Sequence, residues 1–123
     1  MSEQSEYEAV FYELPDGTEP ALEFIESQPL KMSVKIMWTI SLLEYKGPSL
    51  RMPYSKDLGD GIFELRIILG SDITRVLFFF VDDKKVILTH GFTKKTMKTP
   101  PSEIERAKKY RAEYLNRNDG KEA

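Results

Sequence analysis

The sequence of 123 residues has no cysteine, a single histidine and no apolar run close to the roughly 20 residues that cross a bilayer. The missing cysteines exclude disulfides and thiolate metal ligands, and they favour a reducing compartment, the cytoplasm. With one histidine and no acidic cluster at ligand spacing, we expect no metal and no other cofactor. The N-terminus is acidic, unlike that of a signal peptide. These absences predict a cytoplasmic protein that does not associate with membranes.

Positive charge is also absent from one part of the chain. Residues 1–30 contain eight acids and no Lys or Arg, so all 18 basic residues lie in 31–123, where they exceed the remaining acids by six. This asymmetry is compatible with a basic binding face that has an acidic back. The alternative is an acidic strand and helix that are merely solvated and have no partner.

The composition indicates one soluble globular domain, 1–123, because 41% of the residues are hydrophobic and 31% are charged. We expect an ordered core over about 7–115. The predicted elements are a strand at 7–14, helices at 18–28 and 31–45, a basic loop at 49–61, strands at 62–69, 73–82 and 85–92, a basic loop at 94–99, and a helix from 102 to 115 with a frayed tail. The expected fold class is therefore α+β, in the order β-α-α-β-β-β-α, with an antiparallel twisted sheet and two N-terminal helices packed on one face.

Two details of the helices can be predicted as well. In the helix at 31–45 Trp38 is expected in the core, and apolar residues recur at helical spacing on the face that should pack on the sheet. These residues are Val34, Ile36, Met37, Ile40 and Leu43. The S-x-x-E pattern of Ser102 and Glu105 is typical of a capping box, so the last helix should begin at Ser102 or Glu103.

Strand pairing can be tested from residue numbers alone, because directly paired residues share a face of a sheet. With an even loop near 70–72, Arg66 lies opposite Leu77, and with a tight second turn Leu77 lies opposite His90. Arg75 then falls on the same face, so we predict that these three cationic groups point into one concave surface. A three-residue first loop would instead move Arg75 to the buried side. The opposite face would carry the core residues Phe63, Leu65, Ile67, Leu69, Val76, Phe78 and Phe80.

Arginine forks and lysine point charges are the usual ligands of phosphate groups, so this face suits a phosphate-bearing substrate. Each residue also has a purely structural interpretation. Arg66 can pair with Glu64 or Asp60, Arg75 can be an exposed edge charge, and a lone histidine at a strand end is more often structural. The lysines that follow can be a solvated loop.

Several strings of the sequence resemble the RelE/ParE superfamily of type II toxins, within its phage-derived, HigB-like branch. They are L-x-D-G-I-F-E-L-R at 58–66, R-V-L-F-F-F at 75–80, H-G-F-T-K-K-T-M-K-T-P at 90–100 and E-I-E-R-A at 103–107. The resemblance covers nearly the whole chain, from about 7 to 115. One departure is the net charge of −2, since toxins of this superfamily tend to be strongly basic.

The resemblance implies a toxin that cleaves messenger RNA on the ribosome without a metal ion, through attack of the ribose 2′-hydroxyl on the adjacent phosphate. Arg66 and Arg75 match the phosphate-binding arginines of the family, and His90, Lys94 and Lys95 match its basic C-terminal motif. The predicted roles are electrostatic clamps for the arginines and proton transfer for His90 or a lysine. Four residues of the flanking loops are expected to bind RNA: Arg51, Tyr54, Lys56 and Lys98.

The resemblance also implies a partner, a cognate helix-turn-helix antitoxin, beside messenger RNA and the ribosome. Two other functions stay open. One is a non-catalytic poison of DNA gyrase, as in the ParE branch, and the other is an inactive phage-derived accessory protein that keeps the fold.

Overall fold

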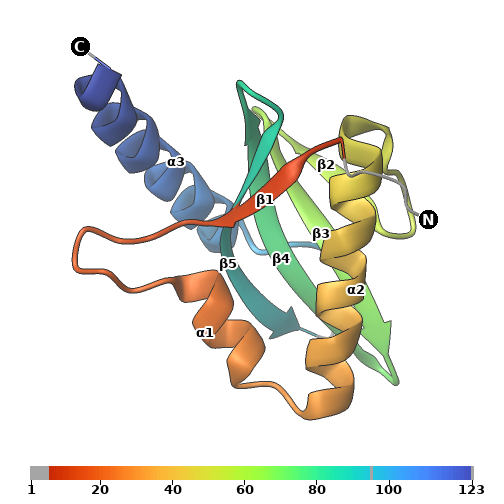
Figure 1. Ribbon diagram of the computed structural model, residues 1–123. Helices are drawn as coiled ribbons and strands as arrows, with labels where there is room; N and C mark the ends of the chain where they lie inside the picture. Colours follow the sequence, from red (N-terminus) through yellow and green to blue (C-terminus); the bar gives the residue numbers. More distant parts are fainter. Residues whose placement is uncertain (1–5, 95, 123) are drawn as a thin grey trace.

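The structure is a computed structural model that describes residues 6–94 and 96–122, in an α+β arrangement as predicted (Figure 1). A first strand is followed by two helices, four strands and a C-terminal helix. The elements are β1 (Glu8–Phe11), α1 (Pro20–Glu26), α2 (Leu30–Lys46), a 3-10 turn η1 (Gly47–Ser49), β2 (Ser55–Gly59), β3 (Ile62–Leu69), β4 (Asp72–Val81), β5 (Lys85–Lys94) and α3 (Pro101–Glu122).

The five strands form one sheet in the order β1-β5-β4-β3-β2. Strands β2 to β5 are a meander of antiparallel neighbours, whereas β1 pairs with β5 in parallel. The sheet is thus mostly antiparallel, as predicted, and β1 adds one parallel edge strand that was not predicted. After β1 the chain passes through both helices to the far edge of the sheet, and the meander then returns it alongside β1 in the same direction (Figure 1).

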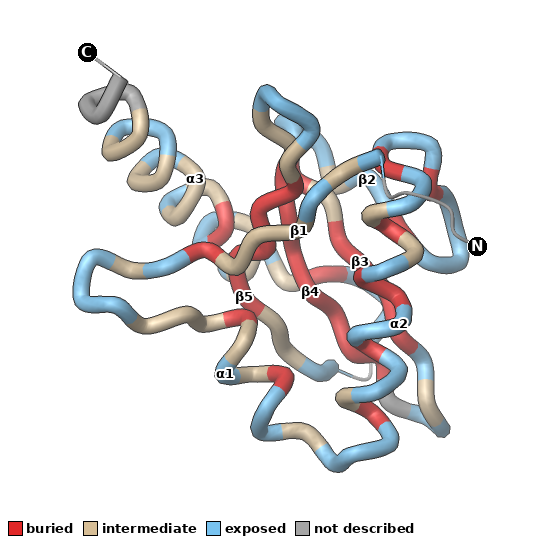
Figure 2. The backbone as a smooth tube through the Cα atoms, viewed as in Figure 1, coloured by how far each residue is buried: buried red, intermediate tan, exposed pale blue. Residues whose placement is uncertain are grey.

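Helices cover both faces of the sheet, and most buried residues lie in the central strands (Figure 2). Helices α1 and α2 pack on one face, where all seven predicted core residues are found. Helix α3 packs on the other face, over a smaller apolar cluster that includes Leu77, Phe79 and Ala107. The second cluster was not predicted, and it covers part of the face on which the cationic residues lie.

Helix α2 contacts the sheet through a narrower stripe than the sequence suggested. Ile36, Ile40 and Leu43 are buried as predicted, but Val34 and Met37 are exposed. Trp38 is also 55% exposed, which corrects its expected place in the core. A straight helix on a sheet buries only the residues that point at the strands, so apolar neighbours on its flanks remain in solvent.

The three cationic residues share one face, as predicted, although the register differs. Arg66 pairs with Arg75, not Leu77, because the first hairpin turns on only two residues between Leu69 and Asp72. This moves the pairing by an even number of positions, which leaves the faces unchanged. Leu77 does pair with His90.

That second pairing depends on a β-bulge that the sequence did not reveal. The hairpin pairs Val81 with Lys85, so its loop has three residues and not the two expected. Thr89 is then the extra residue of a bulge between Phe78–Leu88 and Leu77–His90. The bulge offsets the longer loop, and without it His90 would face the opposite side of the sheet.

Three further boundaries differ from prediction. The basic loop at 49–61 contains β2, whose polar side chains hide its strand character because it lies at a sheet edge. Helix α3 begins at Pro101, since the N–H of Glu103 donates to the carbonyl of Pro100 at 3.0 Å, and no capping box forms. The predicted frayed tail is helical through Glu122. Across the described residues, no helix is long and apolar enough to cross a membrane.

Candidate anion-binding site

Three charged side chains meet on the α3 face of the sheet. Glu64 lies between Arg66 and Arg75, and it is 3.6 Å from the Nε of the first and 3.3 Å from the Nε of the second. Thr99 donates a hydrogen bond to the same carboxylate. All four residues are buried, and we call them the Glu64 cluster. Two guanidinium groups share one carboxylate, so the cluster carries an excess of one positive charge.

The segment that links β5 to α3 crosses this face of the sheet and covers the cluster (Figure 1). Arg75 donates from Nη2 to the carbonyl oxygens of Thr96 at 2.5 Å and Met97 at 2.8 Å. Its side chain is wholly inaccessible to solvent, and burial lowers its pKa while the Glu64 carboxylate opposes that shift. Arg75 therefore fixes the path of the covering segment, and it does not open into the concave surface that the sequence predicted.

Arg66 has much poorer partners for its charge. Its Nη1 and Nη2 reach only thioether sulfurs, those of Met52 at 3.8 Å and Met97 at 3.9 Å, among the residues that the structure describes. Its Nε is buried, and it is within ion-pair distance of Glu64 but not aligned for a hydrogen bond. Thioether sulfur is a weak acceptor, and both methionines are more than half exposed. An anion that displaced the methionines would supply the acceptors that this guanidinium lacks.

His90 is buried on the same face of the sheet as the cluster, separated from Glu64 by Leu77, and both of its ring nitrogens have partners. Nε2 lies 2.9 Å from a carboxylate oxygen of Glu103, and Nδ1 lies 3.1 Å from the hydroxyl of Thr89. The ring stacks on Phe92 and meets the edge of Tyr110. Burial lowers the pKa of His90, and the hydrogen bond that the ring donates to the Glu103 carboxylate opposes this effect. The histidine thus ties β5 to the first turn of α3 and is not presented to solvent.

The remaining predicted residues lie around the covered cluster. Lys94, at the end of β5, and Lys98 are exposed, and so are Arg51, Tyr54 and Lys56 on the β2 side. Lys56 pairs with Glu64 in the sheet, so it belongs to the same face. Lys95 lies outside the described residues. The structure therefore brings Arg66, Arg75 and His90 together inside the fold and leaves four basic side chains at the surface.

A pocket of about 170 Å³ opens beside Arg66, between α2 and the loop before β2. Its walls include Trp38, Pro53 and Tyr54, and the edge of β3 at Ile67 and Ile68 closes its base. The two aromatic rings meet at 62° with their centroids 6.1 Å apart. The pocket is thus an aromatic corner, and its lining also includes Lys35 and Arg66.

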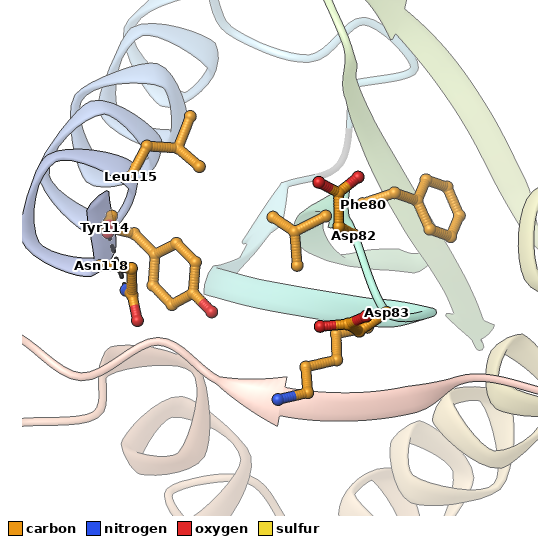
Figure 3. Close-up of a pocket in the computed structure, with 8 residues that line it drawn as sticks. Phe80, Asp82, Asp83, Tyr114, Leu115 and Asn118 are labelled. Atoms are coloured by element: carbon orange, nitrogen blue, oxygen red, sulfur yellow. Dashed lines mark hydrogen bonds between the residues drawn. The ribbon is translucent and has the colours of Figure 1, made fainter. Parts of the chain in front are cut away.

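A larger cavity of about 390 Å³ lies at the other end of the sheet, between the β4–β5 hairpin and α3 (Figure 3). Tyr114, Leu115 and Asn118 line its helical side, and Asp82 and Asp83 approach from the hairpin. These two carboxylates outnumber the one cation of the lining, Lys85, and the net negative charge disfavours a phosphate ligand. The Arg66 side of the molecule is therefore the better candidate for binding an anion.

Several groups that shape this site were not predicted from the sequence. Glu64 was considered only as a partner of Arg66, and Thr99, Met52 and Met97 were not considered at all. One signal was available: an acid flanked by Phe63 and Leu65 in an apolar strand must be paired if it is buried. The path of the segment at 96–99 left no comparable signal, because its composition is that of an exposed loop.

A family model described as "phage derived protein Gp49-like (DUF891)" matches residues 23–112. This covers well over half of the chain, from within α1 to the middle of α3, and includes every residue of the Glu64 cluster. The chain therefore belongs to the Gp49-like, phage-derived family. No curated protein sequence matches it.

Proposed function

We propose that this Gp49-like protein is the toxin component of a type II toxin–antitoxin system and cleaves messenger RNA on the ribosome. The family is related to the RelE and HigB toxins, and the motifs at 58–66, 75–80 and 90–100 favour its HigB-like branch. The protein would act in the cytoplasm, and a helix-turn-helix antitoxin encoded beside it would neutralise it.

The observation that carries this proposal is the excess positive charge of the Glu64 cluster. A buried guanidinium without a matching acceptor is costly, and a protein retains such a group where a ligand completes it. The backbone phosphate of RNA is a suitable ligand, because its non-bridging oxygens accept the parallel hydrogen bonds of an arginine fork. Exposed Lys56, Lys94 and Lys98 would contribute to binding the rest of the strand.

The proposed reaction is a transesterification that needs no metal ion. The ribose 2′-oxygen forms a bond to the adjacent phosphorus while the bond from phosphorus to the 5′-oxygen breaks. The 2′-hydroxyl proton goes to a base on the protein, and an acid protonates the leaving 5′-oxygen. The products are a 2′,3′-cyclic phosphate and a 5′-hydroxyl end. Arg66 would stabilise the charge that builds up on the phosphorane oxygens.

The other residues fit different roles from those the sequence suggested. Arg75 would hold the covering segment, and its charge would add to the field at Arg66. His90 has both nitrogens engaged, so it fits a positioning role at the start of α3 better than proton transfer. Lys94 is exposed on the same face at the end of β5, and it is the better candidate to move a proton.

One observation favours a second function, that of a non-catalytic poison. Arg75 and His90 are both buried and hydrogen-bonded, so the row of groups that the sequence suggested for catalysis is not open to a substrate. A protein with this fold could then act by binding alone, as the gyrase poisons do. The two functions differ in what happens to messenger RNA.

The deciding experiment compares wild type with Arg66→Ala in a translation mixture of purified ribosomes and a defined message. Wild type should cut the message only when ribosomes are present, and Arg66→Ala should abolish the cuts. The variant should still fold, because Glu64 keeps Arg75 as its partner. In binding assays with single-stranded RNA, the loss of one phosphate contact should also reduce the slope of log K against log salt concentration by about 0.7.

Lys84→Gln is the matched control. It removes one positive charge from the β4–β5 turn, roughly 20 Å from Arg75 at about 3.3 Å per strand residue. Its cutting activity should stay near that of wild type. Cuts that persist in Arg66→Ala would refute the role of the cluster. Growth arrest by wild type with intact messages and damaged DNA would support the gyrase poison instead.

A further inference from the structure

The aromatic pocket beside α2, lined by Trp38, Pro53 and Tyr54, has features that no structural role explains. Trp38 is the only tryptophan of the chain, and a large apolar ring that is 55% exposed loses the benefit of burial. It belongs to no described apolar cluster, and its only described ring partner, Tyr54, is itself 38% exposed. We infer that this pocket is a nucleobase subsite, in which one unpaired RNA base stacks while Arg66 holds a phosphate of the same strand.

The volume of the pocket limits the size of the ligand that it can hold. Its volume of about 170 Å³ is well below the 300–1,000 Å³ of pockets for drug-sized molecules. It is therefore suited to a single planar ring system and not to a whole nucleotide or a peptide segment. The walls are mostly apolar, which suits the faces of a base, and the charged residues of the lining are Lys35 and Arg66.

The arrangement of the rings suits stacking. Trp38 and Tyr54 meet at 62°, so a base that lies flat on one ring meets the other ring edge-on. Pro53, between α2 and the edge of the sheet, adds a rigid apolar wall. Single-stranded RNA is commonly bound in this way, with bases stacked on aromatic rings and the backbone held by cations.

The edge of β3 supplies hydrogen bonding. Strand β2 pairs with β3 only over residues 62–65, so the later part of β3 borders the pocket. The N–H of Arg66 points outward to the carbonyl of Tyr54, and the carbonyl of Ile68 points outward to the Lys35 ammonium at 2.7 Å. The alternation of strands places the Ile68 N–H on the same edge. A base with an acceptor on its edge can bind this donor.

Arg66 connects the subsite with the Glu64 cluster, since it lines the pocket and belongs to the cluster. A base in the pocket would leave the adjoining phosphate at the edge of β3 beyond β2, and the RNA strand would pass around this edge to reach the guanidinium on the α3 face. This inference rests on the proposed function for the identity of the ligand, but base binding and cleavage can be measured separately.

The test uses the fluorescence of Trp38, which reports on the pocket directly because it is the only tryptophan. The probe is a short single-stranded oligoribonucleotide with 2′-O-methyl groups, which cannot be cleaved through the 2′-oxygen. It should quench the fluorescence, whereas an abasic ribose-phosphate oligomer of equal length should not. Quenching that is the same with the abasic oligomer would overturn the inference.

Variants measure how much the pocket contributes. Trp38→Ala should weaken binding of the oligonucleotide, followed with a dye on the RNA, by about 5- to 150-fold, the range for one stacked base. Trp38→Phe should recover much of that loss, because it retains a ring to stack on. Tyr45→Ala is the matched control, since Tyr45 is a half-exposed aromatic residue of α2 outside the pocket, and it should bind like wild type.

The outcomes separate this inference from the proposed function. Base-dependent quenching without any cleavage on ribosomes would support the subsite and refute the nuclease. Ribosome-dependent cleavage with an unchanged KM in Trp38→Ala, and no quenching, would refute the subsite and keep the nuclease. If Trp38→Ala bound RNA normally but escaped neutralisation by a co-expressed antitoxin, the pocket would be a protein-docking surface and the base subsite would be wrong.

Discussion

The geometry of the Glu64 cluster allows us to predict how much the Glu64→Gln substitution lowers the free energy of unfolding. Glu64→Gln keeps the shape of the side chain but removes the carboxylate that two buried guanidinium groups share. Breaking a buried ion pair by removal of one partner costs about 3–5 kcal/mol, because an uncompensated charge stays buried. Here two like charges would remain together, so we expect a loss of free energy of unfolding toward the upper part of that range.

Urea unfolding at pH 7 measures this loss, and the melting temperature should fall on the order of 10–20 °C. Inorganic phosphate should stabilise the variant more than wild type, because an anion between the guanidinium groups replaces the missing carboxylate and binds only the folded state. Glu105→Gln is the control, since its carboxylate is exposed on α3 and its removal should have little effect.

A second substitution shows whether the loss comes from charge. Arg75→Met in the Glu64→Gln background removes one of the two orphaned cations, so the double variant should lose less stability than the sum of the two single variants. A loss below about 1 kcal/mol in Glu64→Gln, with no effect of phosphate, would refute the reasoning. It would mean that the cluster is accessible to water and that its excess charge is solvated.

Two further predictions concern the neighbourhood of His90. Burial lowers the pKa of His90 more than Glu103 raises it, so below about pH 6.5 the unfolded chain takes up a proton that the folded chain resists. The free energy of unfolding, measured by urea titration at each pH, should therefore fall from pH 7 to pH 5. In the His90→Gln variant the free energy of unfolding should fall less steeply over the same range. Gly91→Ala should destabilise the fold by about 1–3 kcal/mol in the same assay, because its Cβ would collide with the ring of Phe24, whereas a stability like that of wild type would show that α1 can shift.

The sequence was a good guide to the faces of the sheet and a poor guide to what covers them. Alternation of apolar residues identified the face that packs on α2, and that prediction held although the first register was displaced. The prediction for His90 held for a different reason, since the bulge at Thr89 offset a longer hairpin loop. A register error of two residues leaves each side chain on its predicted face of the sheet. An error of one residue moves every side chain to the opposite face.

The accessibility of the site could not be predicted in the same way. Strand parity placed Arg66 and Arg75 on one face, and they were expected to point from it into a concave surface. Both are buried because the segment at 96–99 crosses the sheet and Thr99 reaches Glu64, a contact between residues 35 positions apart. Local patterns do not encode such a contact. The outward orientation of Trp38 was missed for a related reason, because periodicity alone does not say how wide a face α2 buries.

The parallel pairing of β1 with β5 has a consequence for the order in which the protein can fold. Glu8 pairs with Lys85, so well over half of the chain must be synthesised before the first strand finds its partner. Such distant pairing slows folding, because the entropy of closing the long loop is lost before any contact compensates for it. During this interval only β2, β3 and β4 can cover the apolar stripe of α2. The covering segment at 96–99 emerges later still, so the Glu64 cluster is assembled only when synthesis is nearly complete.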